Sequence, residues 1–465
     1  MSGVRESDVL IVGGGIAGAS AGYFLGRSGA RVTLLEAESS PGTHATGRSA
    51  ALFSEYYGNA VVRELTRASR AFYDTPPAGF SPVAELLRPR GVLALGTPDT
   101  GREFDAAKAS GAGAPQPVVE LDREQALALC PALRPGAFDR ALYKPGARDI
   151  DTDAVLQGFL RGLKATGGSV VTGARVHALT RRRGRWHAAT SAGEFAAPVV
   201  VDAAGAWADR VAESAGATAQ GLVAYRRTAA LVSLPAEQAP ADRATQPVAA
   251  GRALRDRTST DRARTGGAST GGMSTGRTST EGTPTQGPPA RRTSANRFPG
   301  PAGRGGPGTY GTRSGDGGPP GGSAAGIARW PMIADVADTF YARPESGGLL
   351  ISPADAAPVP PGDVRPDDSD VALALDRFRA VVDLPVRHVR RAWAGLRSSA
   401  PDDSPVIGPD PEAPGFCWLA GLGGYGIQTA PAAGALLAAL ITGNEPPPGL
   451  TEAITGTTPA RTGRS

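Results

Sequence analysis

The sequence predicts an α/β fold in which two domains alternate along the chain and a disordered insert interrupts the second one. Three observations indicate this fold. A strand, a glycine-rich turn, a helix and a second strand follow one another near the amino terminus; further buried strands return far downstream; and one long segment has almost no apolar run. A chain of 465 residues ordinarily forms two or three domains.

The first unit of this fold spans residues 8–36. The apolar run from Asp8 to Val12 leads into GGGIAG and then into a helical pattern that Gly29 ends. A second strand, RVTLLE, follows and stops at Glu36. A right-handed crossover makes two such strands parallel neighbours, so this is a Rossmann-type βαβ unit.

The glycine turn predicts a dinucleotide site. Gly13 makes the tight turn, Gly15 lets the backbone approach a pyrophosphate, and Gly18 lets helix and strand pack closely. The pyrophosphate would lie at the helix N-terminus, where free N–H groups favour anions. Glu36 stands where a carboxylate can accept hydrogen bonds from both ribose hydroxyls. These residues do not decide between FAD and NAD.

Three loops of small residues favour FAD. They are GTHATGRSAALFSEYYG at 42–58, VVDAAGAWAD at 200–209 and LAGLGGYGIQTAPAAG at 419–434. Small side chains allow the backbone to pass close to a diphosphate and a flavin. Together the loops could line one extended cofactor, which an NAD enzyme rarely needs.

The expected domains are discontinuous. A Rossmann-type FAD-binding domain is predicted at 1–63, 148–215 and 361–445, with the strand-like runs at 168–176 and 197–203 rejoining its first sheet. A mixed-sheet α+β substrate domain is predicted at 64–147, 216–234 and 329–360. Residues 235–328 are predicted to be a low-complexity disordered insert, and residues 446–465 a flexible tail.

The insert accounts for the basic charge of the chain. Residues 235–328 contain 12 Arg, no Lys and 6 acidic residues, whereas the whole chain has a net charge of +5. The rest of the chain therefore carries −1. An Arg/Gly-rich tract can bind RNA, but this one lacks the interleaved aromatic residues that stack on bases, so no nucleic-acid partner is expected.

The remaining bulk features predict a cytoplasmic protein without a membrane segment. The amino terminus has no basic region followed by an apolar one. The apolar run at 430–442 is too short to cross a bilayer. Cys130 and Cys417 have no metal-type spacing, which argues against a zinc site or a disulfide scaffold.

Six stretches carry a family resemblance: HATGRSAA, DIDTDAVLQGFLRG, DAAGAWAD, FYARP, WAGLRS and GGYGIQT. With them the chain resembles the superfamily of D-amino-acid oxidase, glycine oxidase and sarcosine oxidase, and within it most resembles the D-arginine dehydrogenase subfamily. The resemblance runs from Asp8 to about Gly443, interrupted by the insert. It implies oxidation of a D-amino acid by hydride transfer to flavin N5, giving an imino acid and then a 2-oxo acid and ammonium. The electron acceptor would be oxygen or a quinone.

The resemblance also implies a set of substrate contacts. An arginine fork matches a carboxylate bidentately, and Arg397 occupies the position of the family's carboxylate clamp, with Tyr341 as its partner. A second carboxylate contact falls on Arg226, although Arg227 beside it leaves the register open by one residue. Two further contacts are implied at Tyr57 in EYYG and Gly424 in GGYG.

The motif and the resemblance together predict the cofactor contacts, with His44 only shaping the loop. Residues 392–400 contain no cysteine, so the FAD is expected to be non-covalent. The expected contacts are Gly13, Gly15, Ile16, Ala17, Gly18, Glu36, Ala37, Thr46, Gly47, Arg48, Ser49, Ala50, Val176, Ala204, Gly205, Trp207, Gly423, Gly424, Tyr425, Gly426, Ile427 and Gln428.

Two departures from the subfamily concern the substrate. This chain has Leu52 in place of a histidine and Gly91 in place of a carboxylate that would pair a guanidinium. Burying a guanidinium without a partner is costly. D-Arg and D-Lys are therefore expected to be poor substrates, and neutral or apolar D-amino acids good ones.

Two other functions stay open. One is a glycine- or sarcosine-type amine oxidase or demethylase that uses the same clamp. The other is a non-catalytic FAD-binding protein whose insert recruits a partner.

Overall fold

The computed structural model describes residues 3–83, 85–111, 113–234, 324–345 and 347–461. All of them belong to one structural unit. The predicted disordered insert falls almost entirely on residues 235–323, which lie outside the described residues.

A six-stranded sheet carries the predicted βαβ unit. All its neighbouring strands are parallel except the last pair, and the first four in chain order are arranged 3-2-1-4. This is the order of a Rossmann-type fold, so the predicted fold class is confirmed. Across the sheet the strands are β10 (Ser169–Val171), β3 (Val32–Leu35), β2 (Val9–Val12), β14 (Val199–Asp202), β22 (Phe416–Ala420) and β21 (Val406–Pro409).

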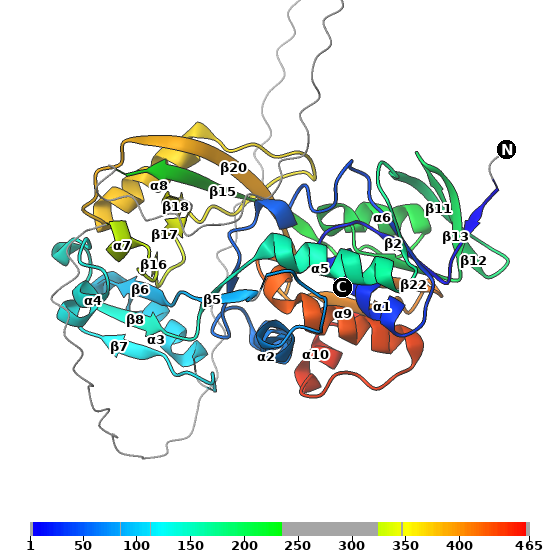
Figure 1. Ribbon diagram of the computed structural model, residues 1–465, viewed down its shortest axis with the longest axis horizontal. Helices are drawn as coiled ribbons and strands as arrows, with labels where there is room; N and C mark the ends of the chain where they lie inside the picture. Colours follow the sequence, from blue (N-terminus) through cyan, green and yellow to red (C-terminus); the bar gives the residue numbers. More distant parts are fainter. Residues whose placement is uncertain (1–2, 84, 112, 235–323, 346, 462–465) are drawn as a thin grey trace, which may run out of the picture. The chain divides into compact units, whose positions relative to one another are not determined.

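Three helices, α1 (Ile16–Arg27), α5 (Thr152–Ala165) and α9 (Gly426–Thr442), pack beside one another next to this sheet (Figure 1). A Cβ atom at Gly18 would lie 1.9 Å from the carbonyl oxygen of Gly13. Only glycine therefore allows α1 to approach the turn this closely, as the motif predicted. Over the described ranges, every helix is too short or too polar to traverse a lipid bilayer.

A second, nine-stranded sheet is mixed. Its two longest strands pair antiparallel from one end to the other. The strands run in the order β19 (Ala357–Pro358), β15 (Val223–Ser233), β18 (Gly348–Ser352), β17 (Tyr341–Glu345), β16 (Met332–Asp335), β6 (Val92–Gly96), β8 (Arg140–Lys144) and β7 (Val119–Leu121), and β20 (His388–Ser399) pairs with β15.

The nine-stranded sheet has its own hydrophobic core. Phe340 and Ile351 from the sheet side pack with Phe378 and Ala126 from helices. The helices and 3-10 turns near this sheet are α3 (Gly101–Ser110), α4 (Arg123–Leu129), α7 (Ala324–Ile327), α8 (Asp368–Val381), η2 (Pro98–Thr100) and η3 (Pro135–Ala137).

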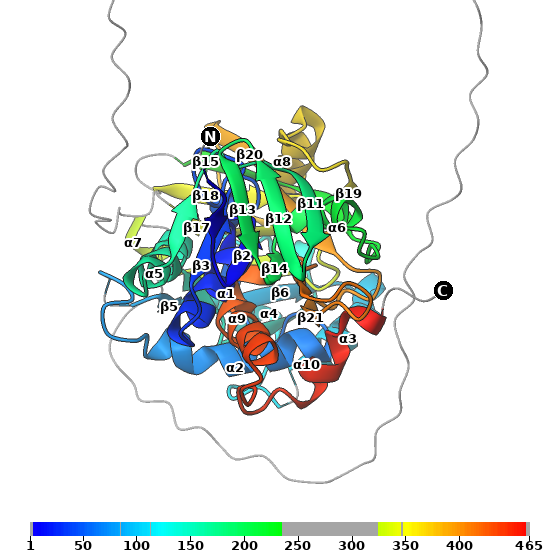
Figure 2. The ribbon, with the colours of Figure 1, turned by 90° about the vertical axis from the view of Figure 1, so that its right-hand side faces the viewer.

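Two small sheets complete the described part. Figure 2 shows β11, β12 and β13 side by side, and they form a four-stranded sheet with β1. The run at 168–176, expected to rejoin the first sheet whole, is divided: β10 joins it, whereas Val176 begins β11. The strands and helices here are β1 (Arg5–Glu6), β11 (Val176–Arg182), β12 (Arg185–Thr190), β13 (Gly193–Ala197), β4 (Leu52–Phe53), β9 (Arg148–Ile150), β5 (Leu87–Pro89), α6 (Ala208–Ala215), η1 (Thr46–Arg48) and η4 (Gly205–Trp207).

Two expected domain boundaries were wrong. Helix α2 (Ala60–Asp74) places Leu65 and Tyr73 in the core around α1 and α9, so residues just after 63 pack with the Rossmann-type domain. Residues 368–399, expected in that domain, form α8 and β20 and pack with the nine-stranded sheet. Linear patterns missed both because the partners are distant in sequence.

The predicted flexible tail was also wrong. Residues 446–461 contain α10 (Thr451–Gly456) and η5 (Pro459–Arg461), and Leu450 and Ala453 are buried. The expected end of the insert needs the same correction, because α7 lies within it and buries Ile327. Each of these two segments has only short apolar stretches among polar residues, so the sequence pattern gave little indication that either one is folded.

Candidate functional site

The first cavity lies at the carboxyl ends of β2 and β3 and at the start of α1. Ligands of open α/β sheets bind at this edge. The predicted cofactor contacts that line it are Gly13, Gly15, Glu36, Ala37, Thr46, Val176, Ala204, Gly205 and Trp207.

The glycine turn in this cavity is already organised. Gly13 has a φ of +108°, and a Cβ atom there would lie 2.4 Å from the carbonyl oxygen of Ala203. The buried Glu36 accepts hydrogen bonds from the backbone N–H of Gly14 and of Glu38, both at 2.8 Å. Gly15 is the N-cap residue of α1 and, as a glycine, has no side chain that could cap the helix. A narrow backbone cradle beside a buried carboxylate fits the diphosphate and ribose of a dinucleotide.

A second cavity adjoins the first, with which it shares Gly15, Thr46 and Gly205 among its lining residues. It is bounded by the start of α1, the η1 loop, β20 and the turn before α9. The predicted contacts that line it are Gly15, Ile16, Ala17, Thr46, Arg48, Ser49, Ala50, Gly205, Tyr341, Arg397, Gly423, Gly424, Gly426 and Ile427.

Two arginines lie on one wall of the second cavity. In the β15–β20 pairing Tyr225 is opposite Arg397 and Arg227 is opposite Gly395, so both guanidinium groups leave the same face of the sheet. Neither makes a hydrogen bond or an ion pair with any residue that the structure describes, and the Nε of Arg227 is buried. Unpaired, partly buried cations form a site for an anion.

The surroundings keep Arg397 charged. Burial by itself would lower the pKa of this guanidinium, but the neighbouring Tyr341, Tyr57 and Asp338 outweigh it and raise the pKa. Nη1 of Arg397 would lie 2.9 Å from a Cβ atom at Gly424, so a side chain there would displace the guanidinium from its present position. Arg397 can therefore act as a permanent carboxylate clamp.

Tyrosines surround this clamp. Tyr341 is 5% exposed and lines the cavity. Tyr57 donates a hydrogen bond to Asp338 at 3.2 Å, and its ring meets Tyr425 edge to face at 4.9 Å. Loss of water around its hydroxyl and the charge of Asp338 raise the pKa of Tyr57, although 37% of the residue is exposed. Its hydroxyl remains a donor at neutral pH.

Arg226, one of the two positions that the sequence offered for the second carboxylate contact, is not in the wall of the second cavity. Arg226 forms an ion pair with Asp370 of α8 at 2.5 Å and another with Asp355 at 3.7 Å, and it does not line the cavity. Successive side chains of a strand point to opposite faces, so a shift of one residue exchanges the two arginines. Arg227 is the one that faces the cavity.

Several other predicted contacts support the site without lining either cavity. Gly18 packs α1 on the turn, and the N–H of Gly47 donates to the carbonyl of Gly42 at 2.7 Å. Gln428 accepts from the N–H of Ser54 and donates to Thr66, both at 3.0 Å. Tyr57 and Tyr425 pack on each other beside the second cavity.

Arg48 lines the second cavity but is already paired. Its guanidinium donates to the carbonyls of Val364 and Ala394 and pairs with Asp363 at 2.5 Å. The Nε1 of Trp393 donates to the carbonyl of Arg48. These contacts tie the η1 loop to β20, so Arg48 shapes the wall rather than offering a free charge.

Some lining residues were missed by the sequence. Arg175 and His177 flank the predicted Val176, and Arg210 lies one helical turn after Trp207. Their positions beside predicted contacts were the feature of the sequence that could have identified them as lining residues. The missed lining residues include Gly14, Glu38, Gly42, Thr43, Arg175, His177 and Arg210 in the first cavity, Gly395 in the second, and Leu396 and Ser398 in both.

Known proteins resemble this chain in both sequence and fold. Glycine oxidase of Geobacillus kaustophilus (strain HTA426) is 28% identical over 45% of this chain and 57% of its own length, and the mitochondrial dimethylglycine dehydrogenase of Rattus norvegicus is 25% identical over 45% and 25%. The chain thus aligns with little more than half of the first relative and a quarter of the second.

The solved structures match over a greater length. The crystal structure of glycine oxidase from Geobacillus kaustophilus aligns with a TM-score of 0.67 at 20% identity over 95% of this chain and 96% of its own. That of L-proline dehydrogenase from P. horikoshii has a TM-score of 0.66 at 17% identity, covering 98% and 100%. These likenesses show the fold.

The family model described as FAD dependent oxidoreductase matches residues 8–320 and 317–440. The cradle around Gly13 and Glu36 and the adjoining second cavity fit the two ends of an FAD molecule. FAD is thus the cofactor, and the chain belongs to the family of FAD-dependent oxidoreductases.

Proposed function

We propose that this oxidoreductase oxidises the CH–NH bond of a D-amino acid with a neutral or apolar side chain. The product would be an imino acid, which water hydrolyses to a 2-oxo acid and ammonium. The observation that carries the proposal is the pair of guanidinium groups, Arg227 and Arg397, which lie on the wall of the second cavity without a partner among the described residues.

The two arginines call for an acid group in the substrate. A carboxylate can accept two parallel hydrogen bonds from the fork of Arg397, and Arg227 can add a third contact. Tyr341 lines the same cavity and can donate from its hydroxyl. A carboxylate held at three points leaves the substrate little rotational freedom, which is the positioning that such a reaction requires of the protein.

The remaining walls suit the flavin end of FAD. Gly423, Gly424 and Gly426 bring the backbone and the N-terminus of α9 to the cavity. When bound, FAD supplies the acceptor for the hydride. No cysteine lines the second cavity in the part of the chain that the structure describes, which supports non-covalent binding.

The preference for neutral side chains rests on two positions. Gly91 has a φ of +70°, and a Cβ atom there would lie 2.8 Å from the ring and hydroxyl of Tyr143. A carboxylate side chain does not fit at this position, and Leu52 offers none. None of the described lining residues of the second cavity is acidic. A cationic substrate side chain would enter without a partner among those lining residues.

An anaerobic screen tests the proposal. Purified holoprotein is mixed with D-Leu, D-Met, D-Phe, D-Ala, D-Arg, glycine, sarcosine and L-Leu, and bleaching of the flavin is followed by absorbance. We expect the neutral D-amino acids to bleach it at least ten-fold faster than D-Arg and L-Leu. Faster bleaching by D-Arg than by D-Leu, D-Met or D-Phe would overturn the proposed side-chain preference.

A glycine- or sarcosine-type amine oxidation is the second candidate. The similarity to a glycine oxidase and to a dimethylglycine dehydrogenase favours it. In the same screen, glycine or sarcosine would then bleach the flavin faster than every D-amino acid. Bound FAD that no amine bleaches would instead favour a non-catalytic protein with a partner-recruiting insert, and deleting the insert would then abolish its role.

Oxygen and a quinone are both proposed acceptors, and we propose a cytoplasmic location. Re-oxidation of the bleached flavin by air, compared with re-oxidation by a soluble quinone, distinguishes an oxidase from a dehydrogenase.

A further inference from the structure

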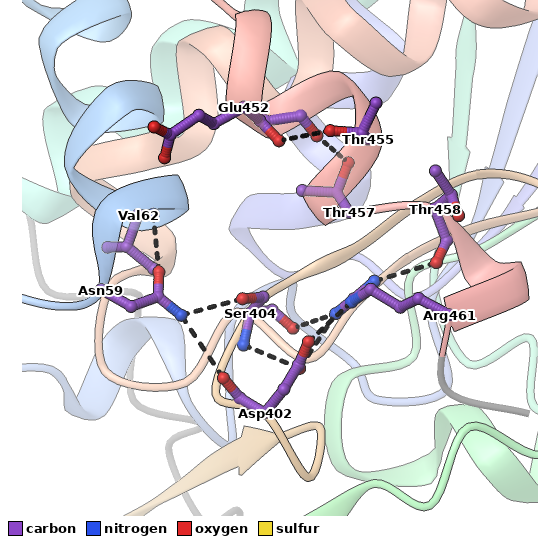
Figure 3. Close-up of polar contacts among 10 residues, drawn as sticks. Asn59, Val62, Asp402, Ser404, Glu452, Thr455, Thr457, Thr458 and Arg461 are labelled. Atoms are coloured by element: carbon purple, nitrogen blue, oxygen red, sulfur yellow. Dashed lines mark hydrogen bonds and ion pairs between the residues drawn. The ribbon is translucent and has the colours of Figure 1, made fainter. Parts of the chain in front are cut away.

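The carboxyl-terminal turn η5 is tied to a loop that continues from β20. Arg461 donates to both carboxylate oxygens of Asp402, at 2.8 and 3.2 Å, and to the carbonyl of Ser404 at 2.7 Å (Figure 3). The side chain of Arg461 is 15% exposed and that of Asp402 46%. Burial acts to raise the pKa of Asp402, but Arg461 outweighs it and lowers the pKa. The pair is therefore ionised at neutral pH.

The same loop is tied to the start of α2. Asn59 donates from Nδ2 to the hydroxyl of Ser404 at 2.8 Å and to the carbonyl of Asp402 at 3.4 Å (Figure 3). Its Oδ1 accepts from the N–H of Val62 at 3.0 Å and so caps the helix. One side chain thus joins the helix start to the loop that Arg461 holds.

The carboxyl-terminal segment is also anchored on α2 itself. The carboxylate of Glu64 accepts from the N–H of Glu452 and of Ala453, at the first turn of α10. A Cβ atom at Gly456 would lie 2.5 Å from Val61, so α10 packs closely on α2. Residues 449–461 therefore hold α2 and the loop at 400–404 together.

These two tied segments lead to the proposed substrate groups. The loop at 400–404 directly follows β20, which carries Arg397, and Asn59 follows Tyr57 after one intervening glycine. Asp403 has a φ of +56°, a strained conformation for a residue other than glycine that persists only where neighbours enforce it. The contacts of Asp402 and Ser404 on either side supply that enforcement.

We propose that Arg461 is a positioning residue for substrate binding. It acts through Asp402, Ser404 and Asn59 to set the placement of Arg397, on the wall of the second cavity, relative to Tyr57 beside it. This inference rests on the proposed function, because it takes Arg397 as the carboxylate clamp. Arg461 itself lines neither cavity.

The test compares Arg461→Ala and Arg461→Lys with wild type in the full-length holoprotein. Arg134→Ala is a control for the loss of a peripheral arginine–aspartate pair, because Arg134 pairs with Asp383 at 2.7 Å, donates to one backbone carbonyl and lines neither cavity. KM, kcat, flavin content and Tm are measured with the best substrate of the screen.

We expect Arg461→Ala to raise KM about ten-fold with full flavin content and a smaller change in kcat. Arg461→Lys, which keeps the charge but loses the fork, should recover part of the loss, and Arg134→Ala should change KM less than two-fold. An unchanged KM in Arg461→Ala, or an equal rise in Arg134→Ala, would overturn the inference. If Arg461→Ala does not yield folded protein, Asp402→Asn is measured against the same criteria.

A binding measurement separates this inference from the proposed reaction. Benzoate, a carboxylate without a reactive amine, is titrated into each holoprotein and the flavin absorbance is recorded. We expect Arg461→Ala to weaken benzoate binding about ten-fold and Arg397→Ala to remove it. If no amine bleaches the flavin, the proposed reaction fails, yet weaker benzoate binding in Arg461→Ala still supports the positioning role. Equal benzoate affinity in wild type and Arg461→Ala contradicts that role.

Discussion

The two adjoining cavities differ in how their polar groups are paired. In the first, Glu36 already accepts two backbone hydrogen bonds, and Thr46 accepts one from the N–H of Ile16 at 3.0 Å. In the second, Arg227 and Arg397 have no hydrogen-bond or ion-pair partner among the described residues. Glu36 and Thr46 are thus held by the chain itself, whereas no described residue pairs the two guanidinium groups, which are therefore available to a ligand.

This difference predicts separable functions. Polar groups that are already paired within the protein mainly shape the cavity wall. Weakening one of their contacts therefore removes little ligand-binding free energy. An unpaired charge contributes binding free energy that appears only with its anion. Changes to the two arginines of the second cavity should therefore weaken amino-acid binding and leave FAD bound, whereas changes in the first cavity should weaken FAD binding and leave amino-acid binding unchanged.

The largest expected effect is that of Arg397→Ala. Loss of the bidentate clamp should lower kcat/KM for the best amino acid about 10³-fold, which corresponds to about 4 kcal/mol. Flavin content should remain at the wild-type level, because Arg397 does not line the first cavity, where the cradle around Gly13 and Glu36 would hold the diphosphate and ribose of FAD. Steady-state kinetics and the absorbance ratio of flavin to protein measure both. Loss of FAD in this variant would contradict the prediction that substrate binding and cofactor binding are separable.

A smaller effect should distinguish two adjacent arginines. Arg227→Ala should raise KM about 10- to 100-fold, because it removes the second guanidinium from the wall. Arg226→Ala should leave KM unchanged and lower stability by about 1 kcal/mol, because it unpairs Asp370 on the other face. KM and urea unfolding of the two variants give the comparison. A larger KM effect from Arg226→Ala would show that the strand register is misassigned.

The smallest effect is expected at the cofactor end. Glu36→Gln keeps one acceptor oxygen and loses the other, so the Kd of FAD should rise about ten-fold. With excess FAD, the KM for the amino acid should equal that of the wild type. Titration of apoprotein with FAD, followed by kinetics at saturating FAD, tests this. An altered substrate KM under those conditions would mean that the two ends are coupled.

Much of the Rossmann-type domain could be predicted from local patterns. The run from Asp8 to Glu36 contains both strands, the helix and every glycine that the turn needs, so adjacent residues specify it. The tail could not be predicted in the same way. The tail has few apolar residues, and polar residues separate Leu450 from Ala453. The burial of these two side chains depends on α2, far earlier in the chain.

The candidate site was predictable where the residues stand next to recognisable turns. Gly13, Gly205 and Gly424 all line the expected cavities. Gln428 and Tyr425 also follow such a turn, yet they hold neighbouring segments instead of lining a cavity. Proximity in sequence identifies the region of a contact, but the direction of each side chain depends on the packing around it.

The sequence by itself determined the βαβ unit, the glycine cradle and the small-residue loops, because these features depend on backbone conformations that only neighbouring residues and glycine provide. Only the tertiary structure decided which of Arg226 and Arg227 faces the cavity, and that the last turn of the chain holds the loop after Arg397. Both outcomes depend on strand pairing and contacts between distant segments, and a shift of one residue in a strand moves a side chain to the opposite face.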